Sequence, residues 1–101
     1  MKKVFFGDFR LYVLSHIKEI TQQDIEPYST EWFLLRYLKR ITKVANGSVE
    51  YTYMEGPIRA LIRFYVDNID EDSELGERCR KVHGEYRKVL LAKQSERNHQ
   101  A

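Results

Sequence analysis

The residue types best suited to chemistry are concentrated between Glu77 and Lys88, in the stretch ERCRKVHGEYRK. Five basic residues, the single cysteine of the chain, a histidine and a glycine fall within about three helical turns. Arginine and lysine bind phosphates and carboxylates, and histidine exchanges protons near neutral pH. The stretch therefore fits three interpretations, which are a catalytic site, an anion-binding face and the solvated side of a helix.

The catalytic interpretation rests on Arg78 and His83, which are separated by four residues and followed by Gly84 and Tyr86. Over residues 78–86 this pattern resembles the R-x4-H signature of the HEPN family of small helical ribonucleases. The resemblance implies metal-independent RNA cleavage at the groove of a dimer, where the arginine and the histidine polarise phosphate and move protons. Positions five apart on a straight helix diverge by about 140°, which places the two side chains at opposite edges of an apolar seam.

The second interpretation is a basic face on the same segment. Projected on a helical wheel, one side carries bases around Gly84, whose missing side chain leaves room for a close backbone approach. The members of this face are Arg80, Lys81, Arg87 and Lys88. The third interpretation stays open, because a helix needs a polar exterior in any case and lysine and arginine are good helix formers.

A comparable basic face is predicted on the second helical segment. Trp32 projects onto this face, one turn from Arg36. The remaining members are Lys39, Arg40 and Lys43. A row of cations beside an aromatic ring is typical of surfaces that follow phosphates and stack a base, and Trp and Arg are also frequent at protein-binding hot spots. We therefore expect binding residues on both faces, with the alternative that Trp32 folds back onto Pro27 and Tyr28.

Other reactive side chains favour structural roles. His16 lies on an apolar stripe without a second histidine or cysteine at metal-ligand spacing, and Cys79 falls among apolar positions. The acidic stretch of residues 67–77 lacks the glycine that a calcium-binding loop needs at its sixth position. The sequence contains neither a glycine-rich phosphate loop nor a nucleophile motif, so we expect no metabolic enzyme, no metal and no cofactor.

Turn residues divide the sequence into four segments, at residues 24–27, 46–48 and 70–73. The first segment, about residues 8–23, carries an apolar stripe at helical spacing that consists of Phe9, Tyr12, Val13, His16, Ile17 and Ile20. Leu11 and Leu14 add a second apolar face, which indicates that this helix is either sandwiched within the fold or shared with a partner, and the second alternative gives the hypothesis of a homodimer. The alternative for the start of the chain is a pair of short strands around Gly7 and Asp8.

The second segment opens with Ser29 or Thr30 as the N-cap and ends at Asn46 and Gly47. In the third, residues 48–54 alternate like a strand or begin a helix, and a helix is clear from Gly56 and Pro57 onward. That helix is apolar on most sides, which predicts the buried centre of the domain, with a polar stripe of Arg59, Arg63 and Asp67. The fourth segment is a predicted helix over about residues 73–93.

The composition bounds the fold. With 101 residues, of which 43% are hydrophobic, the chain can bury one core, which predicts a single domain over residues 1–94 and a disordered polar tail over 95–101. We expect a mainly α, compact four-helix domain with a short β element near residues 49–53. No run approaches the length of a membrane span, and the single cysteine favours a reducing compartment, so we expect a cytoplasmic protein.

These features favour a small, non-enzymatic binding protein of the regulator or inhibitor type, a class that includes accessory proteins of phages and mobile elements. Its partner would be DNA, RNA or an acidic protein surface, because the two basic faces suit each of them. A net charge of +2 does not choose among these partners. The HEPN-like ribonuclease that uses Arg78 and His83 is the alternative function.

Overall fold

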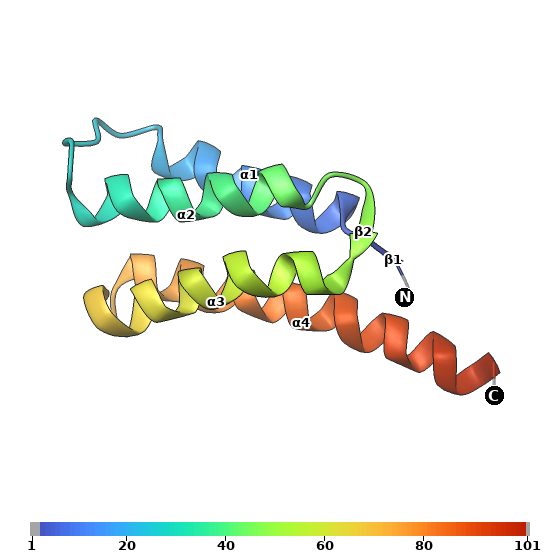
Figure 1. Cartoon of the computed structure of the whole chain (residues 1–101). Coiled ribbons are helices and arrows are strands. Elements are labelled where there is room, and N and C mark those ends of the chain that lie inside the picture. The colour runs from blue at the N-terminus through green and yellow to red at the C-terminus, as the bar shows by residue number, and fades with distance from the viewer. Residues whose placement is uncertain (1–2, 101) are drawn as a thin grey trace.

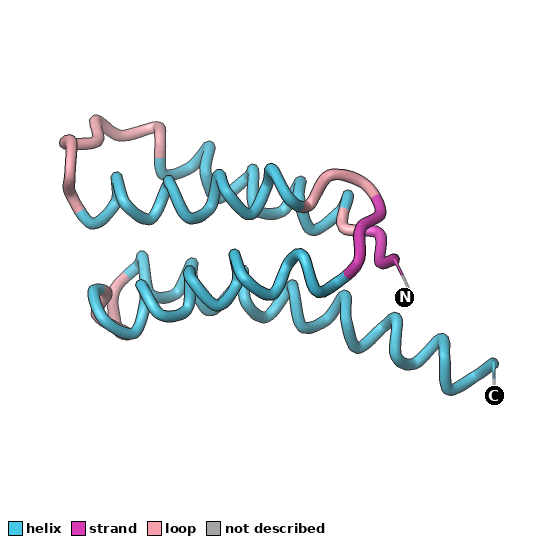
Figure 2. Tube along the Cα trace, in the orientation of Figure 1, coloured by secondary structure: helices cyan, strands magenta, loops and turns pink. Residues whose placement is uncertain are grey.

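The computed structural model describes residues 3–100, with the side chains of residues 3–93, and confirms a mainly helical four-helix domain. In chain order the elements are β1 (Lys3–Phe5), α1 (Gly7–Ile20), α2 (Thr30–Val44), β2 (Ser48–Glu50), α3 (Tyr51–Asn68) and α4 (Glu74–Gln100) (Figure 1). The two strands pair at the end of the bundle where α2 leads into α3 (Figure 2). No helix within residues 3–100 combines the length and the apolar character needed to cross a membrane.

The four helices form a bundle in which α1 and α3 each pack against both α2 and α4. Consequently α2 and α4 occupy diagonal corners, as do α1 and α3 (Figure 1). The prediction that α3 forms the buried centre of the domain is wrong. In a four-cornered bundle every helix keeps an outward side, and on α3 that side includes Val66, which is 70% exposed.

The core is assembled from one stripe of each helix together with the start of the chain. Its most deeply buried side chains are Phe6, Val13, Leu34, Leu38, Ile41, Met54, Leu61, Cys79 and Val82. Burying one such leucine or isoleucine stabilises the fold by about 1.5–3 kcal/mol. The apolar stripe predicted for the first helix is confirmed, since Phe9, Val13, His16 and Ile20 are buried on α1.

The predicted β element near residues 49–53 is confirmed in part. β2 covers Ser48–Glu50 and pairs antiparallel with β1, with Val4 opposite Val49, whereas residues 51–53 are helical. The alternative of two strands around Gly7 holds only for the residues before it. A Cβ atom at Gly7 would meet the ring of Phe5, and that exposed side chain would have to move aside.

Of the two interpretations of residues 48–54, the helical one holds from Tyr51 onward, because α3 begins at Tyr51 and both Gly56 and Pro57 lie inside it. Proline lacks the N–H that would bond to the carbonyl of Tyr53 one turn earlier, which normally disfavours an interior position. Packing outweighs this preference here, since Met54 and Pro57 are both buried.

The predicted ends of α2 are confirmed. Ser29 is the N-cap, and its hydroxyl accepts a hydrogen bond of 3.2 Å from the backbone N–H of Trp32. The helix ends at Val44, and Gly47 follows with φ of 76°, a left-handed conformation that glycine adopts without strain.

At the other end of the chain, the backbone of α4 continues through residues 95–100, where the sequence predicts a disordered tail. Glutamate, arginine and glutamine, which make up half of residues 95–100, favour helix. The last turns of α4 project beyond the bundle (Figure 1). Side chains after Lys93, and all of Ala101, lie outside the described residues, so the domain boundary at residue 94 stays a prediction.

Candidate binding surface on α2

The outward side of α2 carries a basic and aromatic surface, which we call the α2 surface. It consists of Trp32, Arg36, Lys39, Arg40 and Lys43. The inward side of the same helix buries Leu34, Leu38 and Ile41, which recur every three or four residues and fix the rotation of α2 against the core. The four cations are therefore exposed as the sequence predicts, and Trp32 is half-buried at the start of the helix.

The Trp32 ring is held by its neighbours while part of it faces solvent. The centroid of the Tyr28 ring lies 4.8 Å from that of Trp32, and the Phe33 centroid lies 5.0 Å away, edge to face. The Arg36 guanidinium carbon lies 5.0 Å from the Trp32 centroid, which is a cation–π contact. Trp32 therefore contacts Arg36, which the helical spacing predicts, and also Tyr28, which was the alternative prediction.

Tyr28 was not among the predicted site residues, although it is the most exposed of these aromatic side chains at 74%. Its φ of 67° is a left-handed conformation that costs a non-glycine residue about 1–3 kcal/mol. The backbone N–H of Ser29 donates to the carbonyl of Glu26, and Ser29 then caps α2, so the turn is fixed on the side where the helix begins. The strained turn holds the Tyr28 ring out of the core and beside Trp32.

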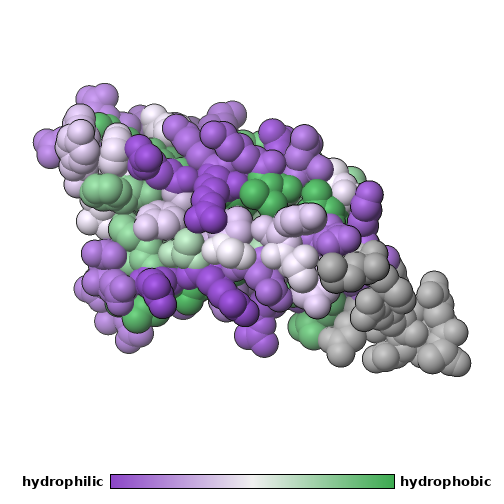
Figure 3. Space-filling view, in the orientation of Figure 1, coloured by the Kyte–Doolittle hydropathy of each residue, from purple (hydrophilic) through white to green (hydrophobic). Residues whose placement is uncertain are grey.

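An open groove of about 670 Å³ runs along the α2 surface. Its lining consists of Tyr28, Trp32, Phe33, Arg36, Tyr37, Lys39, Arg40 and Lys43. Most of the aromatic side chains gather at the start of the helix, and the cations follow along the next two turns. Figure 3 shows hydrophobic and hydrophilic side chains interleaved over the face formed by α2 and α3. The Tyr37 ring stacks on Phe64 of α3 at 4.8 Å between centroids and forms the inner edge of this groove.

Among the side chains of residues 3–93, no carboxylate forms an ion pair with Arg36, Lys39, Arg40 or Lys43. No aspartate or glutamate lines the groove in the described part of the chain. An anionic ligand would therefore meet four cations without displacing a carboxylate of the described residues, although Arg36 also lies over the Trp32 ring.

The second predicted face, which we call the α4 surface, consists of Arg80, Lys81, Arg87 and Lys88. Lys81 pairs with Glu77 at 3.2 Å and Lys88 with Glu85 at 3.1 Å. Arg80 donates to the Tyr65 hydroxyl at 3.1 Å and to the backbone carbonyl of Glu71. Within residues 3–93, only Arg87 of this set makes no such ion pair or hydrogen bond, so most of the α4 surface is already satisfied.

The structure does not bring the two predicted surfaces together. Both point outward from the bundle, and they belong to α2 and α4, which stand at diagonal corners (Figure 1). The space around Gly84 is open, since no atom lies within 4 Å of the position of an added Cβ. A ligand that contacts the α2 surface would therefore leave most of the α4 surface free.

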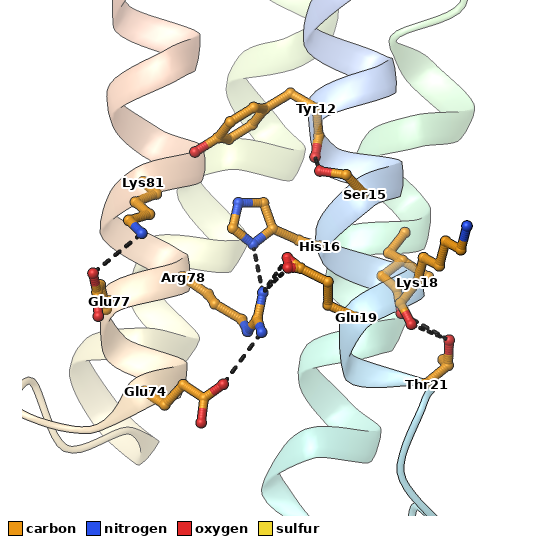
Figure 4. A network of polar contacts seen from close by, with 11 residues as sticks. Tyr12, Ser15, His16, Lys18, Glu19, Thr21, Glu74, Glu77, Arg78 and Lys81 are labelled. Carbon is orange, nitrogen blue, oxygen red and sulfur yellow. Dashed lines mark hydrogen bonds and ion pairs between the residues drawn. The ribbon is translucent and has the colours of Figure 1, made fainter.

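Arg78 belongs to a polar network between α1 and α4 (Figure 4). Its Nη1 donates to Nδ1 of His16 at 3.0 Å and to a Glu19 carboxylate oxygen at 3.2 Å. Its Nη2 donates to Glu74 at 3.2 Å. Burial, and then the charge of Arg78, lower the pKa of His16 below its usual value, which agrees with a neutral ring accepting from arginine. The predicted core position of His16 is confirmed, and Arg78 is its partner.

His83 lies on the opposite flank of α4. It lines a shallow groove over the outer side of α3, together with Arg59, Arg63 and Val66. Burial, and then the charge of Arg87, lower the pKa of His83. Arg78 thus faces α1 while His83 faces α3, as the angular separation along the helix predicts. Within one chain, the two residues of the R-x4-H pattern do not share a site.

The remaining predicted features fall in the core or on α1. Cys79 is buried, as predicted, and burial raises the pKa of its thiol to about 11, so the nucleophilic thiolate is scarce at neutral pH. Within the described residues, no group of three or more His, Cys, Asp or Glu side chains is placed to hold a metal ion. Leu11 is 62% exposed and Leu14 is half-buried, and the homodimer through them stays a prediction.

Comparison with known proteins gives no relative from which a function can be carried over. No protein-family model, curated protein sequence or solved structure matches this chain. The functional argument therefore rests on the geometry and charge of the α2 surface.

Proposed function

We propose that this protein is a non-enzymatic binding protein that contacts an anionic macromolecular partner through the α2 surface. One observation carries the proposal. Four exposed cations lie on one side of α2 beside Trp32, and none of them pairs with a carboxylate among the side chains of residues 3–93. Oppositely charged groups on a partner would supply the missing counter-charges.

The pairing state of a cation decides how much it contributes to binding. An exposed lysine that already pairs with a glutamate one turn away must give up that contact before it meets a ligand, and a paired carboxylate also repels anions. An unpaired cation releases only bound counterions and water. For this reason the proposal assigns the partner to the α2 surface rather than to the α4 surface.

The aromatic end of the groove supports recognition of a macromolecule rather than of small ions. Tryptophan, tyrosine and arginine dominate binding hot spots, where a large ring supplies contact area and a polar group fixes orientation. Trp32 has Tyr28, Phe33 and Arg36 around it and still faces the groove. A binding protein of this size acts as a regulator or inhibitor by occupying its partner.

A matched pair of charge reversals tests the proposal. The double variant Arg36→Glu with Arg40→Glu changes the charge of the α2 surface, and Arg87→Glu with Lys88→Glu makes the same change on the α4 surface. Binding to anionic probes, namely poly-glutamate and a mixed-sequence oligonucleotide, is followed by the fluorescence of Trp32, the single tryptophan, and by anisotropy of labelled probes.

We expect the α2 double variant to bind roughly 100-fold more weakly, because log affinity falls with each phosphate or carboxylate contact removed. The α4 double variant should lose no more than about threefold, through the general field of the protein. Equal losses in the two variants would contradict a binding site on α2. Circular dichroism of both variants checks that the helices are intact.

A further inference from the structure

We infer that the partner of the α2 surface is a single-stranded nucleic acid whose unpaired bases stack on Tyr28 and Trp32 while its phosphates follow the cations of α2. The inference rests on the proposed function and names the class of partner. It is carried by the division of the groove into two parts. The aromatic end is formed by Tyr28, Trp32 and Phe33, and the part that we call the cationic length is formed by Arg36, Lys39, Arg40 and Lys43. DNA and RNA share this chemistry, and the experiment below separates them.

The aromatic end is suited to base stacking. Tyr28 is held out of the core by its left-handed backbone conformation, and its ring stands 4.8 Å from the Trp32 ring at an interplanar angle of 47°. Tyr28 is 74% exposed, so its ring can offer a face to a base, and every base has a π-face that can stack. Bases in a duplex are already stacked on one another, so this contact selects a single strand, a loop or an end.

The cationic length matches the dimensions of a short strand. From Trp32 to Lys43 the helix rises by roughly 16 Å, which would hold about five phosphates at the spacing of about 3.4 Å found along one strand of a duplex, and fewer in a more extended single strand. Single-strand binding sites span roughly 4–16 nucleotides. The cations recur along this length at Arg36, Lys39, Arg40 and Lys43, which places one or two charges on every turn.

The same division disfavours an acidic helical peptide as the partner. A helix that docks in a groove inserts apolar side chains at intervals of three or four residues, so its groove needs apolar pockets along the whole length. Beyond Phe33, the only apolar side chain lining the groove in the described part of the chain is that of Tyr37, and its ring is stacked on Phe64. The cationic length offers charge without such pockets.

The experiment uses the full chain and four probes of about ten units, a length within the usual range of single-strand sites. The probes are single-stranded DNA, single-stranded RNA of the same sequence, the corresponding DNA duplex, and an abasic oligonucleotide that keeps the phosphates and removes the bases. Each is titrated at two salt concentrations with Trp32 fluorescence as the readout. We expect saturable quenching by a single-stranded probe, with binding at least tenfold tighter than to the duplex or the abasic chain.

Tyr28→Ala isolates the stacking contribution, and Tyr53→Ala is its matched control. Tyr53 is also exposed, at 64%, but it lies on α3 and does not line the groove. Tyr28→Ala should weaken binding of the base-containing strand roughly 5- to 100-fold. Its affinity for the abasic chain should stay unchanged, and Tyr53→Ala should leave both affinities unchanged.

The outcomes separate the inference from the proposed function. Equal binding of single strand, duplex and abasic chain, or tighter binding of poly-glutamate, would overturn the nucleic-acid inference. If those affinities still depended on Arg36 and Arg40, the anionic-partner function would stand. Failure of every anionic probe to bind would overturn both. A difference between the DNA and RNA strands would tell which of the two the surface prefers.

Discussion

The α2 and α4 surfaces are alike in sequence and different in structure. Each places four cations on the outer side of one helix, and they stand at diagonal corners of the bundle. On α4, Lys81 and Lys88 pair with glutamates of their own helix, and Arg80 bonds to Tyr65 of α3. On α2 the cations have no carboxylate partner among residues 3–93, and one of them covers an aromatic ring.

This difference indicates that the affinity of a helix surface for anions depends less on the number of its cations than on whether those cations are already paired within the protein. Glutamates one turn from a lysine stabilise a helix by about 0.3–0.5 kcal/mol and lower its attraction for other anions. Two of the four predictions that follow change the charge or the pairing on one of the two surfaces. The others concern the Arg78 network between α1 and α4 and the protonation of the histidines.

The largest effect is expected when the α2 surface is made to resemble α4. Lys39→Glu removes a cation and offers a carboxylate to Arg36 and Lys43, which lie three residues before it and four after it. We expect affinity for single-stranded DNA to fall roughly 100-fold. Lys39→Gln, which removes the charge without pairing the neighbours, should cost only about fivefold. Fluorescence titration measures both, and equal losses would show that pairing does not distinguish the surfaces.

The second prediction concerns Arg78, which we regard as a structural contact between α1 and α4. Arg78→Ala removes hydrogen bonds to His16, Glu19 and Glu74 and should lower the free energy of unfolding by about 1–3 kcal/mol. Urea denaturation measures the loss, and Arg63→Ala is the exposed control, with an expected change within about 0.5 kcal/mol. DNA affinity should be unchanged in both variants.

A catalytic role would give a different pattern. Metal-independent RNA cleavage by the wild-type protein, abolished by both Arg78→Ala and His83→Ala, would contradict the structural assignment of Arg78 and support the ribonuclease alternative. Intact cleavage in the His83→Ala variant would remove that alternative.

The third prediction releases the α4 cations. The double variant Glu77→Gln with Glu85→Gln leaves Lys81 and Lys88 without their carboxylate partners. Affinity for the abasic oligonucleotide should rise by about two- to fivefold, because Lys81 and Lys88 are released from their ion pairs and two negative charges are removed. Anisotropy at low salt measures the gain. An unchanged affinity would mean that the ion pairs with Glu77 and Glu85 are not the reason why the α4 surface binds anions weakly.

The smallest effect is a pH dependence of stability. The pKa values of His16 and His83 are both lowered in the folded protein, so the unfolded chain binds protons first as pH falls. Their contribution is fully present above about pH 6.5, the ordinary histidine value, and is lost as pH falls through the lowered pKa values. Urea midpoints at pH 7.5 and 5.5 test this, with His16→Gln expected to flatten the change.

Much of the fold is predictable because the helices are amphipathic and capped. The stripe of α1 and the Ser29 cap follow directly from spacing and residue type. The start of α3 stayed open in the sequence because residues 49–54 also alternate like a strand and a local rule places proline in the first turn, whereas Met54 and Pro57 are both buried in the longer helix. Its outward side was missed because the sequence does not show which helices are neighbours.

The candidate site shows the same limit. Trp32 and the α2 cations share one face by helical spacing alone, and the pair of Glu77 with Lys81 could have been recognised from its spacing of four. The contact of Arg80 with Tyr65 joins two helices, so no local pattern reveals it. The exposure of Tyr28 depends on a positive φ in a turn, which the residue type itself disfavours.

The central claim is that α2, and not α4, is the binding surface, and an NMR titration tests it most directly because it reports on both surfaces at once. A ¹⁵N-labelled sample is titrated with single-stranded DNA of about ten nucleotides. We expect shifts in the Trp32 indole N–H and in the amides of residues 36–43, with the amides of residues 80–88 unchanged. Shifts centred on residues 80–88, with the Trp32 indole signal unmoved, would contradict this claim.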